Sequence, residues 1–257
     1  MKEDSKKREF EVLNLVVQHY IKESKPISSG YLCDRANLSC SSATVRNVME
    51  SLEKKGYLSH IHTSSGRVPT QEGFQYYVGR LKEENMLDEE IVGLLQERII
   101  ADMEIDLRHA RDIEYIFDRT LDVLATISGY ASLVAISGFE DKFFFRGMRF
   151  IFNQPEFEDI HRLKSLFYAL EVKIDDLQDL LFRYTKEDMC ILIGDQIGVS
   201  DISGCSMVIS GIEHSDLTAS LALLGPMRMD YVRAVSALHS VKHNLESILE
   251  GVWDETT

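Results

Sequence analysis

One stretch, residues 41–67, constrains the fold of this chain more than any other; it reads SSATVRNVMESLEKKGYLSHIHTSSGR. Ser41 can cap a helix, because its hydroxyl can accept from an unpartnered backbone N–H of the first turn. Gly56 stands where a helix favours a left-handed residue just beyond its end. The apolar residues between them recur with helical spacing and predict one buried face: Val45, Val48, Met49 and Leu52.

A short hairpin is predicted to follow this helix. Residues 57–58 have the composition of a strand, residues 63–66 are typical of a turn, and Val68 begins a return strand. A helix, a strand, a polar loop with a basic tip and a second strand together form the C-terminal part of a winged helix-turn-helix.

Polar side chains suited to DNA lie on the helix face opposite the apolar stripe. Arg can pair with guanine through two hydrogen bonds, and Asn can pair with adenine in the same way. Hydroxyls and helix N-terminal amides suit phosphate oxygens. A solvated helix that binds nothing would also carry small polar residues near its cap, so chemistry alone leaves both interpretations open. The residues expected to contact DNA are Ser41, Ser42, Thr44, Arg46, Asn47, His62, Thr63, Ser64, Ser65, Gly66 and Arg67.

This part of the chain resembles a known family. SSATVRNVMESLEKKGYL and HTSSGRVPTQEGFQYYV closely resemble the DNA-binding domain of HrcA, the bacterial heat-inducible repressor of chaperone genes. KPISSGYLCDRANLSCSSATVRN is similar to the helix-turn-helix of that family. Family members usually have an acidic residue where this chain has Val48, inside the predicted recognition helix.

The charges are unevenly divided along the 257 residues, whose net charge is −14. Residues 1–80 hold 12 Lys+Arg and 9 Asp+Glu, whereas the remainder holds 16 and 33. Residues 1–80, called here the head, are thus mildly basic, and the rest of the chain is acidic. This distribution fits a DNA-binding domain attached to a domain that DNA repels. We expect a DNA-binding domain over residues 1–82, a helical linker over 83–128 and an α+β domain over 129–257.

Three further helices are predicted in the head. The first spans residues 9–22 after a frayed start, and the second lies near residues 30–36, with Ser28 or Ser29 as its cap. Thr70 can cap the last, which carries Phe74, Tyr77, Val78 and Leu81. Tyr76 and Tyr77 are better explained by core packing than by stacking on bases, because proteins that read duplex DNA seldom stack on bases.

Residues 88–128 are predicted to be mostly helical, with a break near residues 106–111. The resemblance implies an inverted-repeat site in DNA, which requires two heads related by a two-fold axis, so we expect a homodimer. The apolar stripe of these helices can form the dimer seam, or it can pack only on its own domain; periodicity does not name the partner. The final helix from Met229 is a second candidate seam, and the helices of residues 88–128 are preferred because they adjoin the heads. The seam residues expected on the first interpretation are Ile91, Leu95, Ile99 and Met103.

The remaining residues predict an antiparallel sheet with helices on one or both faces. Strands are expected at residues 132–137, 143–152, 189–193, 205–211 and 218–224, and helices from Pro155, over 174–182, and from Pro226.

The order of NQPEFEDIHRLKSLFYALE, ILIGDQIG, CSMVIS and LLGPMRMDYVRAVSALHSV resembles the GAF-like domain of HrcA. The family's closing GPTRMDY motif is matched by Gly225, Pro226, Arg228, Met229, Asp230 and Tyr231, with Met227 in place of Thr. The family's dimerising insert is absent or severely shortened, because only a turn fits between Ser137 and Phe143.

The sequence gives little indication of a metal site, a phosphate-binding loop or a catalytic centre. His60 and His62 lie on one side of an extended segment, but a metal site requires a third ligand. Residues 194–198 lack the Lys-Ser/Thr of a phosphate loop, and no His-acid pair is evident near Cys205. The four cysteines form no CxxC pair and indicate free thiols in a reducing cytosol. We expect no enzyme activity, no cofactor, no metal and no membrane span.

The resemblance implies a repressor that binds double-stranded DNA at an inverted-repeat operator of chaperone operons and is released on heat stress. It further implies a bacterial, cytoplasmic, nucleoid-associated protein and names a chaperonin as a candidate partner. Two alternatives stay open: a ligand-sensing regulator with a GAF-like effector domain, and an interaction module whose winged helix binds protein. Arg46, Asn47 and Arg67 favour DNA.

Overall fold

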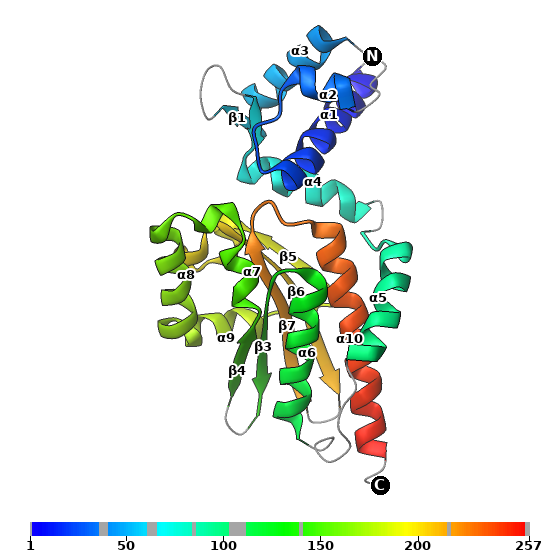
Figure 1. Cartoon of the computed structure of the whole chain (residues 1–257), viewed down its shortest axis with the longest axis vertical. Coiled ribbons are helices and arrows are strands. Elements are labelled where there is room, and N and C mark those ends of the chain that lie inside the picture. The colour runs from blue at the N-terminus through cyan, green and yellow to red at the C-terminus, as the bar shows by residue number, and fades with distance from the viewer. Residues whose placement is uncertain are drawn as a thin grey trace. The chain divides into compact units, whose positions relative to one another are not determined.

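The computed structural model describes residues 2–35, 41–60, 66–83, 86–102, 112–138, 141–214 and 217–254 (Figure 1). The chain forms two compact units, Met1–Asn85 and Met86–Thr257, called here the first and second units. The boundary between them falls in the polar segment that separates the two resemblances in the sequence.

The first unit is a set of helices with a two-stranded antiparallel sheet. Its elements are α1 (Lys2–Glu23), α2 (Ser29–Arg35), α3 (Ser42–Lys54), β1 (Leu58–His60), β2 (Arg67–Pro69) and α4 (Gln71–Glu83). The order of helices and strands is that of a winged helix-turn-helix, as predicted. The predicted start of the first helix near residue 9 is wrong, because α1 begins at Lys2. The expected turn over residues 37–39 lies outside the described residues.

Side-chain caps fix the helix starts of the first unit. The Ser28 hydroxyl accepts from the Tyr31 N–H at 3.1 Å, and the Thr70 hydroxyl accepts from the Gly73 N–H at 3.0 Å. Gly56 has φ of 81° just beyond α3, where only a residue tolerant of the left-handed region is comfortable. The buried apolar side chains of the unit come from every helix and include Leu13, Val17, Leu32, Met49, Phe74 and Tyr77.

The second unit is built on a five-stranded antiparallel sheet in the order β4-β3-β7-β6-β5. Its strands are β3 (Ala131–Ser137), β4 (Lys142–Arg146), β5 (Cys190–Ile193), β6 (Cys205–His214) and β7 (Leu217–Pro226). Its helices are α5 (Glu89–Asp102), α6 (Ile113–Ser128), α7 (Met148–Phe152), α8 (Ile160–Val172), α9 (Ile174–Phe182) and α10 (Tyr231–Asp254). Three short 3-10 turns are η1 (Pro155–Phe157), η2 (Gly194–Ile197) and η3 (Ser200–Ile202).

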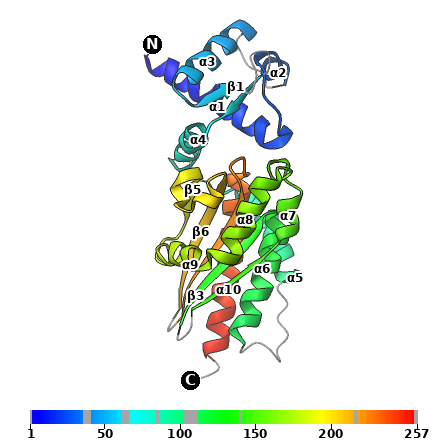
Figure 2. The same ribbon diagram turned by 90° about the vertical axis from the view of Figure 1, so that its left-hand side faces the viewer.

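Helices cover both faces of this sheet (Figure 2). On one face, the buried Ser132 hydroxyl donates to the Leu121 carbonyl of α6, and Ser206 and Tyr231 share a hydrogen bond between β6 and α10. On the other face, Ser220 donates to the Leu181 carbonyl of α9 at 2.9 Å. The alternation of strand residues between the faces produces two apolar layers. The α+β fold predicted from the sequence is therefore confirmed.

Two predicted boundaries in the second unit are wrong. Residues 143–152 do not form one strand, because Gly147 adopts φ of 81° and the chain turns there into α7. Pro226 does not open the last helix; it ends β7 opposite Cys205. The helix begins at Tyr231 instead, where the Asp230 carboxylate accepts from the Arg233 N–H at 3.2 Å.

Candidate nucleic-acid interface

Helix α3 has the two faces that the sequence predicts. Its start is capped by the Ser41 hydroxyl, which accepts from the Thr44 N–H at 3.2 Å. Val48 is half-buried, and the other three residues of the predicted apolar stripe are buried: Val45, Met49 and Leu52. The helix is thus fixed by its apolar side, which leaves the opposite side at its N-terminal half for contact with another molecule.

The polar residues of that half are accessible. The Arg46 side chain is 71% exposed and reaches Glu50 at 3.5 Å, one turn along the helix. An exposed pair of this kind is worth well under about 1 kcal/mol, so the guanidinium can leave Glu50 at little cost. Asn47 is exposed as well, and Thr44 is half-buried. Ser41 and Ser42 are exposed, and the Ser42 hydroxyl donates to the Ser29 hydroxyl of α2 at 3.4 Å.

The other end of α3 is attached to α1 by a carboxylate. Glu9 accepts from the Ser51 hydroxyl at 2.8 Å and from the Lys55 ammonium at 2.5 Å. The hydrogen bond from Lys55 holds the pKa of the Glu9 carboxyl below its usual value. Sequence reasoning missed this contact, because nothing local links residues more than forty positions apart.

A second carboxylate joins α3 to the two strands. Glu53 lies between His60 of β1 and Arg67 of β2: one oxygen contacts His60 Nδ1, and the other is 3.1 Å from both Nε and Nη2 of Arg67. Partial burial acts to raise the pKa of Glu53, but the hydrogen bonds and charges of its two partners outweigh burial and lower the pKa. Glu53 therefore fixes the hairpin to the helix.

Arg67 and Gly66, both expected to contact DNA, have structural partners. Arg67 is only 8% exposed, so a DNA contact by its guanidinium would require that it leave Glu53. The backbones of Arg67 and Ile27 exchange hydrogen bonds of 2.8 and 2.9 Å. A Cβ atom on Gly66 would lie 2.4 Å from the Ile27 carbonyl carbon, so only glycine fits this approach. The remaining expected contacts lie outside the described residues: His62, Thr63, Ser64 and Ser65.

Glu53→Gln should loosen this hairpin without changing its shape. We expect the melting temperature of the first unit at neutral pH to fall by about 5 °C, the shift that about 1 kcal/mol causes in a domain of this size. A carboxylate whose folded pKa is lowered contributes stability above its ordinary pKa of 4.5, and that stability is lost as pH falls through the folded pKa.

The difference in melting temperature between wild type and Glu53→Gln should therefore shrink as the pH is lowered from 7 to below 4.5. Thermal melts of both proteins over this range measure it. An equal difference at every pH would show that the charge of Glu53 is not what holds the hairpin.

Two of the four residues expected at a dimer seam are buried inside the second unit. Helix α5 packs along α10, and Leu95 and Ile99 are 8% and 0% exposed in the single chain. Ile91 is half-buried, and Met103 lies outside the described residues. Leu95 and Ile99 thus pack on their own unit, which was the alternative to a dimer contact.

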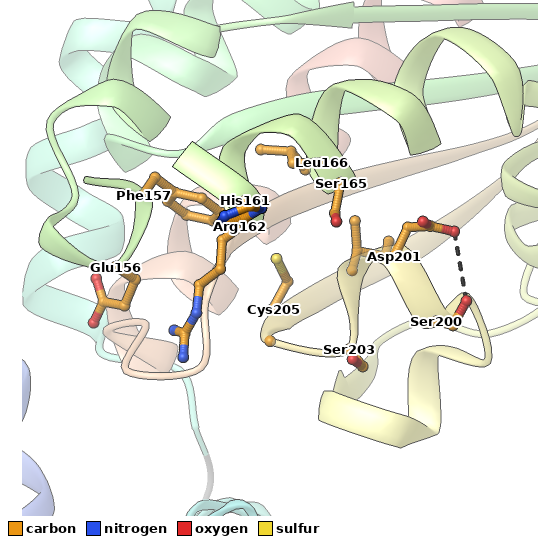
Figure 3. A pocket seen from close by; sticks show the side chains of 12 residues that line it. Glu156, Phe157, His161, Arg162, Ser165, Leu166, Ser200, Asp201, Ser203 and Cys205 are labelled. Carbon is orange, nitrogen blue, oxygen red and sulfur yellow. Dashed lines mark hydrogen bonds between the residues drawn. The ribbon is translucent and has the colours of Figure 1, made fainter. Parts of the chain in front are cut away.

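The second unit also contains a cavity of about 350 Å³ between α8 and η3 (Figure 3). Phe157, Leu166 and Ile202 form its apolar wall. Its polar lining consists of several hydroxyls and four side chains with ionisable groups: Glu156, His161, Arg162 and Asp201. Cys205 begins β6 at this cavity, and burial raises the pKa of its thiol to about 12, so the sulfur is a poor nucleophile. The three described cysteines are all free thiols.

The described residues include no helix long and apolar enough to cross a membrane. Over the same residues, no group of three or more His, Cys, Asp or Glu side chains is placed to hold a metal ion.

Comparison with known proteins decides the family. Residues 51–235 match the family described as the HrcA protein C terminal domain. The chain belongs to the HrcA family. Among its relatives is the heat-inducible transcription repressor HrcA of Bacillus pumilus, which is 25% identical and is covered over 99% of its length, with 96% of this chain aligned. The protein of the same name from Desulforamulus reducens is 26% identical, with 98% of this chain and 99% of that protein aligned.

These HrcA relatives are longer than the present chain. The alignment with the Bacillus pumilus protein spans 342 positions, whereas this chain has 257 residues, so at least 85 positions have no counterpart here. The fold of this chain is also seen in a crystal structure of a hypothetical protein, with a TM-score of 0.71 and 16% sequence identity. The comparison covers 95% of this chain and 98% of that protein's chain.

The residues of the HrcA closing motif form hydrogen bonds that stabilise the local structure of this chain. The Tyr231 hydroxyl donates to the Met227 carbonyl at 2.6 Å, and the Asp230 N–H donates to the Tyr130 hydroxyl at 2.8 Å. Arg228 donates to Glu156 at 2.5 Å, which connects the motif to the turn before α8. Burial raises the pKa of Tyr130, so its hydroxyl stays protonated. The motif therefore fixes the turn between β7 and α10.

Proposed function

We propose that this HrcA family member is a transcription repressor that binds double-stranded DNA through α3. Helix α3 enters the major groove, where Arg46 and Asn47 read base edges and the hydroxyls of Ser41, Ser42 and Thr44 contact phosphate. The target is an inverted-repeat operator of heat-shock genes in the bacterial nucleoid, occupied by a homodimer. The observation that carries the proposal is the exposure of Arg46 and Asn47 on a capped helix in a winged helix-turn-helix.

A band-shift experiment tests this function. The wild-type protein is titrated onto an inverted-repeat operator and onto a scrambled duplex of the same length and composition, at several salt concentrations. We expect the operator to bind at least about a thousand times more tightly, and both affinities to fall with salt as counterions are displaced from phosphates. Equal affinities for the two duplexes would contradict a sequence-reading function.

Release from DNA on heating follows from the limited stability of folded domains. A protein whose free energy of unfolding is about 5–15 kcal/mol can unfold over a few degrees, and an unfolded DNA-binding domain does not bind DNA. A chaperonin that refolds the protein would then set how quickly repression returns. Operator occupancy should fall at the temperature at which the DNA-bound protein unfolds; release well below that temperature would point to another signal.

A second candidate function is regulation by a small molecule, and the cavity beside α8 favours it. Its volume of about 350 Å³ lies within the range of small-ligand sites, and its lining combines apolar side chains with hydroxyls and with both acidic and basic side chains. A ligand bound there should raise the melting temperature of the protein and change operator affinity together.

A further inference from the structure

The outer surface of α7 and α8 carries several exposed apolar side chains. Within the described part of the second unit, large apolar side chains that are about half exposed or more are found at Leu94 and at four positions of this surface. These four are Phe152, Ile160, Tyr168 and Val172, at 52%, 54%, 47% and 60% exposure. The Phe167 ring stacks on Phe152 with centroids 5.9 Å apart. Exposed apolar side chains gathered on neighbouring helices in this way favour an interaction site.

The inner side of α8 is fully used by its own unit. Leu166, Ala169 and Leu170 are buried in the core between α8, α9 and the sheet. Figure 2 looks onto the helix from outside, and there α8 lies on the surface of the second unit. The apolar residues on its outer side are therefore additional to those that hold the helix in place.

The charges on this outer surface are arranged to complement a second copy of themselves. Lys164 and Glu171 are two turns apart and so lie on one side of α8, about 10.5 Å from each other along its axis. In the residues described, neither side chain forms an ion pair. If two copies of α8 lie antiparallel, with the two-fold axis between Phe167 and Tyr168, each Lys164 faces Glu171 of the other copy.

We propose that this surface binds a second copy of the same chain, with α8 packed antiparallel on α8. The contact is isologous: aromatic rings from Phe167 and Tyr168 lie at its centre, and two Lys164–Glu171 pairs flank them. Leu95 and Ile99 of α5 are buried within their own chain and are not available for this role. The need for a dimer rests on the proposed inverted-repeat operator, but the surface is identified from its own residues.

Charge reversal tests the pairing. Sedimentation of the full chain without DNA gives the dimer dissociation constant of the wild type, of Lys164→Glu and of Glu171→Lys. Each single reversal turns two attractive pairs into two repulsive ones, so we expect the constant to rise about tenfold. In a mixture of the two variants, a heterodimer has two attractive pairs again, and the mixture should associate as tightly as the wild type.

Leu94→Glu is the matched control, because Leu94 is an exposed apolar residue at 68% on α5, away from this surface. Its dimer constant should equal that of the wild type. A wild type that stays monomeric at high micromolar concentration would overturn the proposal, as would a dimer insensitive to both reversals or a mixture that is no tighter than either variant. Because no DNA is present, failure here is distinct from failure of operator binding.

Discussion

Leu95→Glu should unfold the second unit under conditions in which the wild type is folded, with a loss of about 3–5 kcal/mol in the free energy of unfolding. Leu95 is 8% exposed and lies on the side of α5 that packs along α10. A carboxylate there would be removed from water, which is costly for a charged group. The loss should be seen directly as a lower midpoint in urea unfolding followed by circular dichroism.

Leu94→Glu provides the comparison, because Leu94 is the neighbouring residue and is 68% exposed. Its free energy of unfolding should change by less than about 0.5 kcal/mol. If Leu95→Glu were as stable as Leu94→Glu but lost the ability to dimerise, Leu95 would lie at a dimer seam and the packing of α5 on α10 would be the wrong account.

The same pair of residues shows what periodicity can and cannot predict. The spacing of Leu95 and Ile99 correctly indicates a buried helix face, because burial follows from hydrophobicity alone. Which surface buries it depends on α10, more than a hundred residues later in the chain, and no local pattern carries that information. Burial of Leu95 and Ile99 within their own unit is the reason why we propose the dimer contact on α8 and not on α5.

Helix and strand ends were predicted well where a side chain or a glycine determines them. Ser28, Ser41 and Thr70 all cap the helices expected of them, because a hydroxyl before a helical pattern acts within three residues. The prediction over residues 143–152 was wrong because the phenylalanine-rich run favours a strand and hides the turn at Gly147. A Cβ on Gly147 would lie 2.5 Å from the Ala125 Cβ, a constraint from another element.

The candidate DNA-binding site likewise contains some residues that the sequence predicts and others that it does not. Arg46 and Asn47 were predicted from their place on a helix and are exposed as that prediction requires. Glu9 and Glu53 were missed, although they attach α3 to α1 and to the hairpin. Nothing in the sequence marks an acidic residue near a DNA-binding helix as structurally important. Its role depends on basic and hydroxyl partners that only folding brings close to it.

Arg46→Ala combined with Asn47→Ala should abolish most sequence preference in DNA binding. Each side chain can contribute about 1–3 kcal/mol to discrimination between bases, so the double variant should lose roughly a hundredfold or more in operator affinity. Binding to a scrambled duplex depends on phosphate contacts and should fall much less. Both side chains are exposed, so the variant should melt at the wild-type temperature.

Lys54→Ala is the control for this pair. Lys54 is exposed on the same helix but lies in its last turn, away from the N-terminal half that is expected to read bases. Its removal also takes one positive charge from α3. It should leave the preference for the operator over the scrambled duplex unchanged, so any loss specific to the double variant comes from base reading and not from net charge.

The most direct measurement is the ratio of the two dissociation constants, scrambled over operator, for the wild type and for the double variant at one salt concentration. If the exposed face of α3 reads the operator, the ratio is large for the wild type and for Lys54→Ala, and falls at least about a hundredfold for Arg46→Ala with Asn47→Ala. A folded double variant that keeps the wild-type ratio would contradict the assignment of α3 as the recognition helix.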